Sequence, residues 1–139
     1  NMAEVLIRRL NILDLPDFKD LCDESEWYYP QVCLTPQALL KYELYRNNCF
    51  VAYDGNTLVG YIYGGVLCDT LYPQFAFVRE IYRKRGIGRK LMEALEQNAN
   101  CSVSMIYYHK SLSNHYKKQG YEIGTALEVA IKQFGGEVL

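Results

Sequence analysis

The residues best suited to chemistry lie between positions 82 and 92, in the stretch YRKRGIGRKLM. Two glycines, Gly86 and Gly88, stand among five cationic side chains, and an apolar pattern of helical period follows. The cations are Arg83, Lys84, Arg85, Arg89 and Lys90. The first turn of a helix carries unpaired N–H donors and about half a positive charge, and glycines let an anion approach that backbone. The stretch is therefore predicted to bind a phosphate group.

Two common nucleotide-binding patterns fit this stretch poorly. A P-loop would need GxxxxGK followed by Ser or Thr, and a dinucleotide fingerprint would need a third small residue where Leu91 stands. A structural alternative is that the cations only solvate the start of a helix while the glycines serve a tight turn. The stretch alone leaves both interpretations open.

The surrounding pattern places the stretch between a strand and a helix. Residues 71–78 predict a strand, and residues 86–98 predict a helix. The buried stripe of this helix is predicted to be Ile87, Leu91, Ala94 and Leu95. Further on, 101–108 reads as a strand, 111–119 as a short helix closed by Gly120, and 121–134 as one or two final strands.

The N-terminal half predicts a strand at 5–10 and a helix at 13–22 that Asp14 can cap. A second helix is expected over 35–45, with Thr35 as N-cap and Pro36 in its first turn. Residues 49–65 predict a hairpin that turns at Asp54-Gly55-Asn56. Hairpins imply antiparallel pairing and the strand–helix–strand unit over 72–108 implies parallel pairing, so we expect a mixed α/β sheet with helices on both faces.

Two segments of the chain resemble the GNAT family of N-acetyltransferases. Residues 83–88, RKRGIG, are similar to the family signature R/Q-x-x-G-x-G/A, and NHYKKQGYE (114–122) resembles a second family element. The predicted element order also matches, so the resemblance implies a single GNAT-like domain over 1–139, with a mixed, mostly antiparallel sheet.

The resemblance implies acetyl-CoA as the cosubstrate. In the family the pyrophosphate lies on the amides of the signature loop, here Arg85 to Lys90, so the residues expected to bind the cofactor include Arg83, Lys84, Arg85, Gly86, Ile87, Gly88, Arg89 and Lys90. The pantetheine arm would pair with Phe77 and Val78 at a splayed sheet edge. The strand containing Phe77 is therefore expected to diverge from the strand at 102–107.

The resemblance also implies catalytic residues. Tyr116 matches the usual general acid, since a phenol can protonate the departing thiolate. Some members use a glutamate as the general base at the position where Tyr72 stands here. Glu80 is therefore a candidate base, and it could instead be a counter-charge to the arginines. A bound water chain could also remove the proton. His109 could contact the cofactor or relay a proton, or serve structure alone; His115 is expected to point away.

The amine acceptor is expected near the loop at 23–34 and the strand at 61–72. The loop brings together acidic and aromatic side chains, which suit a cationic amine. They are Asp23, Glu24, Glu26, Trp27, Tyr28 and Tyr29. The alternative is a solvated loop whose aromatic residues enter the core, and the acceptor's identity stays open.

Composition narrows the remaining choices. With a net charge of −1 the chain does not have the positive electrostatic field expected of a general nucleic-acid binder. No apolar run approaches the ~20 residues that a membrane-spanning helix needs. Five widely spaced cysteines favour reduced thiols, and hence a cytoplasmic location, over a disulfide framework or a zinc site. No metal is expected, and EVAIKQF (128–134) could pair two copies as a homodimer.

The function expected from these residues is transfer of an acetyl group to a primary amine by direct attack. A non-catalytic acyl-CoA sensor on the same fold is the alternative, and a protein-interaction domain with a basic patch is a third.

Overall fold

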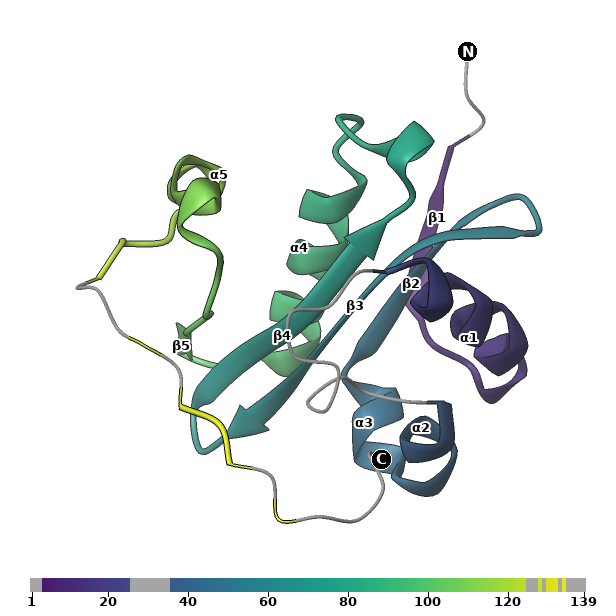
Figure 1. Ribbon diagram of the computed structural model, residues 1–139, viewed down its shortest axis with the longest axis horizontal. Coiled ribbons are helices and arrows are strands. Elements are labelled where there is room, and N and C mark those ends of the chain that lie inside the picture. Colours follow the sequence, from purple (N-terminus) through teal and green to yellow (C-terminus); the bar gives the residue numbers. More distant parts are fainter. Residues whose placement is uncertain (1–3, 26–35, 125–127, 129, 133, 135–139) are drawn as a thin grey trace. The chain divides into compact units, whose positions relative to one another are not determined.

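A computed structural model of the chain describes residues 4–25, 36–124, 128, 130–132 and 134 (Figure 1). The chain divides into two compact units, one ending at Ile106 and one beginning at Tyr107. The first contains a five-stranded sheet and its helices; the second contains a short helical segment. That both form one domain over 1–139 stays a prediction.

The first unit is built on a sheet whose strands follow one another in sequence order. The strands are β1 (Leu6–Arg9), β2 (Cys49–Asp54), β3 (Thr57–Leu67), β4 (Thr70–Val78) and β5 (Val103–Ser104). The first four pair antiparallel and β5 pairs parallel to β4, which confirms the predicted mixed sheet. Two-residue turns join β2 to β3 and β3 to β4, and Gly55 takes a positive φ of 59° in the first.

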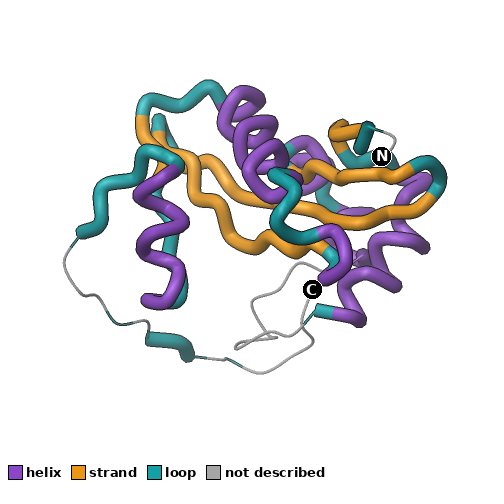
Figure 2. Tube along the Cα trace, turned by 90° about the horizontal axis from the view of Figure 1, so that it is seen from above, coloured by secondary structure: helices purple, strands orange, loops and turns teal. Residues whose placement is uncertain are grey.

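Helices cover both faces of this sheet (Figure 2). Alternate side chains of a strand point to opposite faces. Accordingly Tyr61 packs against Phe18 of α1 (Leu15–Glu24), whereas neighbouring Gly60 faces Leu91 of α4 (Ile87–Ala99). The predicted stripe of α4 is confirmed at Ile87, Leu91 and Leu95, with Met92 also buried and Ala94 half-buried.

Two predictions for the N-terminal helices need correction. The helix expected over 35–45 is two helices, α2 (Pro36–Lys41) and α3 (Glu43–Asn47), separated by an extended Tyr42. The break is stable because the Arg46 guanidinium donates to the carbonyls of Leu39 and Leu40 at the end of α2. Thr35 lies outside the described residues.

Asp14 stands at the N-cap of α1, but its side chain caps no helical N–H there. The carboxylate instead accepts from both Nη atoms of Arg8, at 2.7 and 2.8 Å, and from the hydroxyl of Tyr53 at 2.9 Å. Asn11 caps the preceding 3-10 turn, Ile12–Asp14. Asp14 therefore joins β1, β2 and the start of α1 rather than acting as a cap.

Two predicted strands are shorter than expected or are not formed. The strand predicted over 101–108 is β5, with only two residues, because pairing with β4 ends at Leu71↔Ser104. Within 121–134 no strand forms in the described residues. The described part of the second unit contains no strand with which this segment could form a ladder, and an isolated strand is not stable in water.

No helix in the described ranges is both long and apolar enough to cross a membrane. No disulfide joins the four described cysteines, Cys22, Cys49, Cys68 and Cys101, and Cys33 lies outside the described residues.

Candidate cofactor and catalytic site

The predicted phosphate loop joins the end of β4 to α4. Lys84 and Gly86 adopt left-handed φ values of 64° and 80°, and Gly86 is the N-cap of α4. Gly86 has no side chain that could cap the helix, and among the described residues no group accepts from the N–H groups of its first turn, Ile87 to Arg89, so these are available as donors. A helix start of this kind can bind an anion, and binding of one by this loop stays a prediction.

The two glycines of the loop are needed for different reasons. Gly86 has a backbone conformation that disfavours any side chain. Gly88 has no positive φ, and a Cβ built there meets no protein atom within 4 Å. Neither the backbone conformation nor the packing of the described residues requires glycine at position 88. The open space above it fits the close approach of a phosphate-bearing cofactor.

The cations of the loop are engaged to different degrees. Arg83 Nε donates to the Val78 carbonyl at 2.7 Å, and its guanidinium lies 5.3 Å from the Phe77 ring. Arg89 lies 3.7 Å from Glu93, and Arg85 lies over the Tyr82 ring. Lys84 and Lys90 make no ion pair within the described part of the chain and are exposed.

The loop is fastened by a hydrogen bond that sequence reasoning missed. The Tyr82 hydroxyl donates to Asp54 Oδ2 at 2.6 Å, joining the loop to the end of β2. This hydrogen bond to a carboxylate is the main cause that raises the pKa of Tyr82 above its ordinary value. The sequence pattern indicates Asp54 only as a turn residue, so nothing in it connects the two positions.

The edge of β4 beyond Leu71 diverges from β5, as predicted. The ladder between β4 and β5 contains only Thr70↔Val103 and Leu71↔Ser104 in the described chain, whereas β4 stays paired with β3 as far as Val78. The Arg79 N–H donates to Val59 on the β3 side, so by alternation the Val78 carbonyl points to the open edge. Arg83 binds that carbonyl, at the position where the pantetheine arm is predicted to pair.

A β-bulge interrupts β4 in its middle. Tyr63 pairs with Phe75 and Gly64 with Pro73, so Gln74 is the extra residue. Pro73 has no N–H to donate to the ladder, which a bulge tolerates. Gly64 fits opposite it because a Cβ there would lie only 2.7 Å from the Tyr72 carbonyl oxygen. Pro73 was the feature of the sequence that could have predicted this bulge, since a proline inside a strand marks a bulge or an edge strand.

Glu80 and Arg79 follow β4. Glu80 begins a 3-10 turn, Glu80–Tyr82, and its side chain is exposed. Arg79 reaches Glu24 Oε1 at 3.1 Å. Asp23 accepts from Lys19 at 3.0 Å, so both described carboxylates of the predicted acceptor loop already have a cation beside them. Glu26, Trp27, Tyr28 and Tyr29 lie outside the described residues.

The sheet face on the α1 side carries a series of aromatic rings. Tyr61 and Tyr63 stack with ring centroids 6.1 Å apart, and Phe77 and Phe75 of β4 lie beside them at 6.4 and 5.6 Å. Tyr61 and Tyr63 are buried and the two phenylalanines are half-buried. Tyr61 and Tyr63 lie within 61–72, the stretch expected to border the acceptor, which is not one strand but the end of β3, a turn and the start of β4.

The second unit contains Tyr116 on α5 (Ser113–Lys118). Its ring contacts Tyr108, His115 and Tyr121, with centroid distances of 5.0, 5.0 and 5.7 Å. Burial raises the pKa of its phenol, which keeps the proton on the oxygen at neutral pH.

The two histidines have local partners in the second unit. His109 Nδ1 accepts from the Ser111 N–H at 3.2 Å and lies 2.8 Å from Ser111 Oγ, so His109 caps the turn before α5. His115 pairs with Gln119 at 2.8 Å and is exposed. A role for His109 toward the cofactor stays a prediction.

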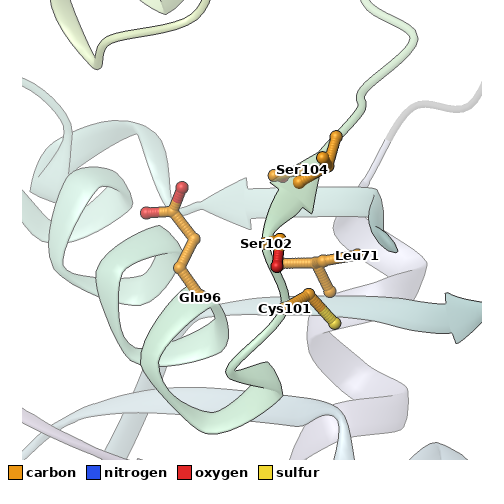
Figure 3. A pocket seen from close by; sticks show the side chains of 6 residues that line it. Leu71, Glu96, Cys101, Ser102 and Ser104 are labelled. Atoms are coloured by element: carbon orange, nitrogen blue, oxygen red, sulfur yellow. The ribbon is translucent and has the colours of Figure 1, made fainter. Parts of the chain in front are cut away.

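A shallow cavity of about 190 Å³ lies near the C-terminal end of α4 (Figure 3). It is lined by Leu71, Glu96, Cys101, Ser102, Val103 and Ser104. Its helical lining residue, Glu96, lies about 14 Å along the axis of α4 from Ile87, so the cavity is not part of the predicted cofactor site.

The fold and the loop together define an acyltransferase type of domain. The family model described as an acetyltransferase (GNAT) domain matches residues 45–123. The chain therefore belongs to the GNAT acetyltransferase family. No curated protein sequence matches it.

Solved structures share the fold at low sequence identity. The aminoglycoside N-acetyltransferase AAC(6')-Iy, in complex with CoA, is 18% identical with a TM-score of 0.70, covering 94% of this chain and 95% of its own. The PaiA N-acetyltransferase of Thermoplasma acidophilum, in complex with coenzyme A, is 19% identical with a TM-score of 0.68, over 88% and 92%. A ribosomal-protein-alanine N-acetyltransferase of Brucella melitensis is 15% identical with a TM-score of 0.70, over 95% and 100%.

Proposed function

We propose that this protein transfers the acetyl group of acetyl-CoA directly to a primary amine. The proposal rests on the first turn of α4. Its N–H groups have no side-chain cap, and no described atom fills the space beside Gly88. The family match and the CoA complexes of proteins with this fold support the same ligand. A cytoplasmic location is proposed from the cysteine pattern alone.

The residues of the loop hold the cosubstrate. The N–H groups of Ile87, Gly88 and Arg89 donate to the diphosphate, with Lys84 and Lys90 adding charge. The open edge of β4 at Phe77 and Val78 pairs with the pantetheine amides, and Arg83 must then release the Val78 carbonyl. Acetyl-CoA supplies an activated acetyl thioester.

The acceptor nitrogen loses two protons in the reaction. The acceptor ammonium loses one proton to a base, and its nitrogen then attacks the thioester carbonyl carbon. As the new C–N bond forms and the C–S bond breaks, Tyr116 donates its phenolic proton to the leaving sulfur, and the second proton of the nitrogen returns to Tyr116 through solvent, which restores the phenol. Much of the rate comes from holding the amine beside the thioester.

Tyr116 is proposed as the acid because its position matches that of the family's general acid, and its phenol is protonated at neutral pH. We expect Tyr116→Phe to lower kcat about a hundredfold while the Kd for CoA stays within twofold. Tyr107→Phe, which changes an exposed tyrosine of the same unit, is the matched control and should leave kcat unchanged. Equal loss in both variants would argue against Tyr116 as the acid.

Glu80 is proposed as the base, with a counter-charge to the arginines as the other role. Glu80→Gln separates the two, because loss of a base lowers kcat, whereas loss of a nearby negative charge tightens CoA binding and leaves kcat unchanged.

The whole proposal is tested with the full chain by CoA calorimetry and by thiol release from acetyl-CoA. The amine panel contains a polyamine, an aminoglycoside, free amino acids and peptides with free N-termini. Thiol release with an acetylated amine product is the expected result. CoA binding without release for any amine would favour the sensor, and absence of CoA binding would favour the interaction domain.

A further inference from the structure

A hydrogen bond joins Tyr82, just before the signature loop, to a distant part of the chain. Tyr82 lies at the end of the 3-10 turn that follows β4, where its N–H donates to the Arg79 carbonyl at 2.9 Å. Its hydroxyl reaches Asp54, the last residue of β2, at 2.6 Å. Both side chains are half-buried. A hydrogen bond this short to a carboxylate is of the stronger, charge-assisted kind.

The ring of Tyr82 also supports a cation. The Arg85 guanidinium lies over it, 5.3 Å from the ring centroid, and Arg85 directly precedes Gly86. A guanidinium on an aromatic face loses fewer conformations when it meets an anion than one that moves freely in water. The orientation of Arg85 therefore depends on the orientation of the Tyr82 ring, and the ring in turn depends on Asp54.

We infer that Tyr82 and Asp54 are positioning residues of the cofactor site: their hydrogen bond fixes the ring that holds Arg85 beside the uncapped start of α4. The inference rests on the proposed function. Neither residue touches the anion in this arrangement, because Tyr82 acts through Arg85 and Asp54 acts through Tyr82. Their contribution is to the affinity for the cosubstrate and not to the chemical step.

The charge of Asp54 complicates a simple substitution. Removing a carboxylate near an anion site strengthens anion binding, which opposes the loss of positioning. Asp54→Ala and Asp54→Asn remove the same charge, but the asparagine carbonyl can still accept from the Tyr82 hydroxyl. Comparing those two variants isolates the hydrogen bond at constant charge, and Tyr82→Phe removes it without any change of charge.

The experiment measures the Kd for CoA by calorimetry and the steady-state constants for acetyl-CoA. We expect Tyr82→Phe to weaken CoA about fivefold and to raise KM with kcat unchanged at saturation. Asp54→Ala should bind CoA about fivefold more weakly than Asp54→Asn. In the Asp54→Ala background Tyr82→Phe should have no further effect, whereas in the Asp54→Asn background it should cost its full fivefold.

Controls separate positioning from folding. Each variant is first checked by thermal unfolding, and Tyr45→Phe, which removes a hydroxyl from α3, should leave CoA affinity unchanged. Kd values within twofold of wild type for Tyr82→Phe, equal Kd values for the two Asp54 variants, or additive effects in the Asp54→Ala background would overturn the inference alone. Absence of CoA binding by the wild-type chain would overturn the proposed function, and this inference with it.

Discussion

At the scale of single residues, Gly88 gives the sharpest test of the cofactor site. Gly88 is the second residue of α4, a helix disfavours glycine relative to alanine, and no described residue crowds this position, so folding alone would favour alanine here. We expect Gly88→Ala to leave the free energy of unfolding unchanged or to raise it by up to about 1 kcal/mol. The same methyl group should weaken CoA at least tenfold, because it fills the space that a phosphate would need.

Urea unfolding and calorimetry measure the two effects on the same protein. Gly124→Ala is the matched control, since a Cβ at Gly124 also meets nothing within 4 Å but lies outside the loop. Unchanged CoA affinity in Gly88→Ala would mean that the diphosphate does not approach this backbone.

The sequence predicts residues whose role depends on local spacing and misses those that depend on the fold. Arg83, Gly86 and Gly88 could be identified because six consecutive residues carry the pattern. Tyr82 and Asp54 could not, because they meet only after β2, β3 and β4 have paired in register. The engagement of Arg83 with the Val78 carbonyl is likewise a property of the folded strand end.

At the scale of elements, one ion pair joins β1 to the start of α1. Asp14 is buried, which by itself would raise its pKa, but hydrogen bonds from Arg8, the Asn11 N–H and Tyr53 lower it below its ordinary value. A carboxyl group whose pKa is lowered on folding stabilises the protein above its unfolded pKa. That contribution is lost as the pH falls through the folded value, below about 4.

We therefore expect Asp14→Asn to cost about 1–3 kcal/mol at pH 7 and less as the pH approaches 3. Urea unfolding of both proteins across this pH range is the measurement. Asp23→Asn breaks only an exposed pair with Lys19 and should cost under about 0.5 kcal/mol. A cost of Asp14→Asn that does not change with pH would contradict the assignment.

The elements predicted correctly are those with strong local signals. The hairpin at 49–65 has its turn residues, and α4 has a clear apolar stripe. The division of 35–45 at Tyr42 depends on Arg46 reaching back to α2, which no periodicity indicates. β5 is short because its pairing with β4 ends after two residues. That length depends on the geometry of both strands and cannot be predicted from the residues of β5 alone.

At the scale of the whole molecule, CoA binding should appear as stability. The chain has a net charge of −1, yet five cations lie within residues 83–90, so the attraction for an anion is local. At a CoA concentration of a hundred times Kd we expect about 2.7 kcal/mol of added stability. For a chain of this length that raises Tm by about 5–10 °C in a thermal scan.

The control for this measurement is inorganic phosphate at the same concentration. We expect it to raise Tm by under about 1 °C, since it lacks the pantetheine arm that pairs with β4. An equal shift with both compounds would indicate nonspecific anion binding at the basic loop.

The two-residue turns of the sheet also bear on the order in which the molecule assembles. Strands β2, β3 and β4 form two hairpins with very short loops. Closing such loops costs little conformational entropy, and hairpins form in microseconds. β1 must instead find β2 across about forty residues, as Arg9 meets Phe50, and β5 joins only after α4 has been made. We expect the three-stranded meander to be the folding nucleus, so that a growing chain builds the strand for the cofactor before the helix that binds its phosphates.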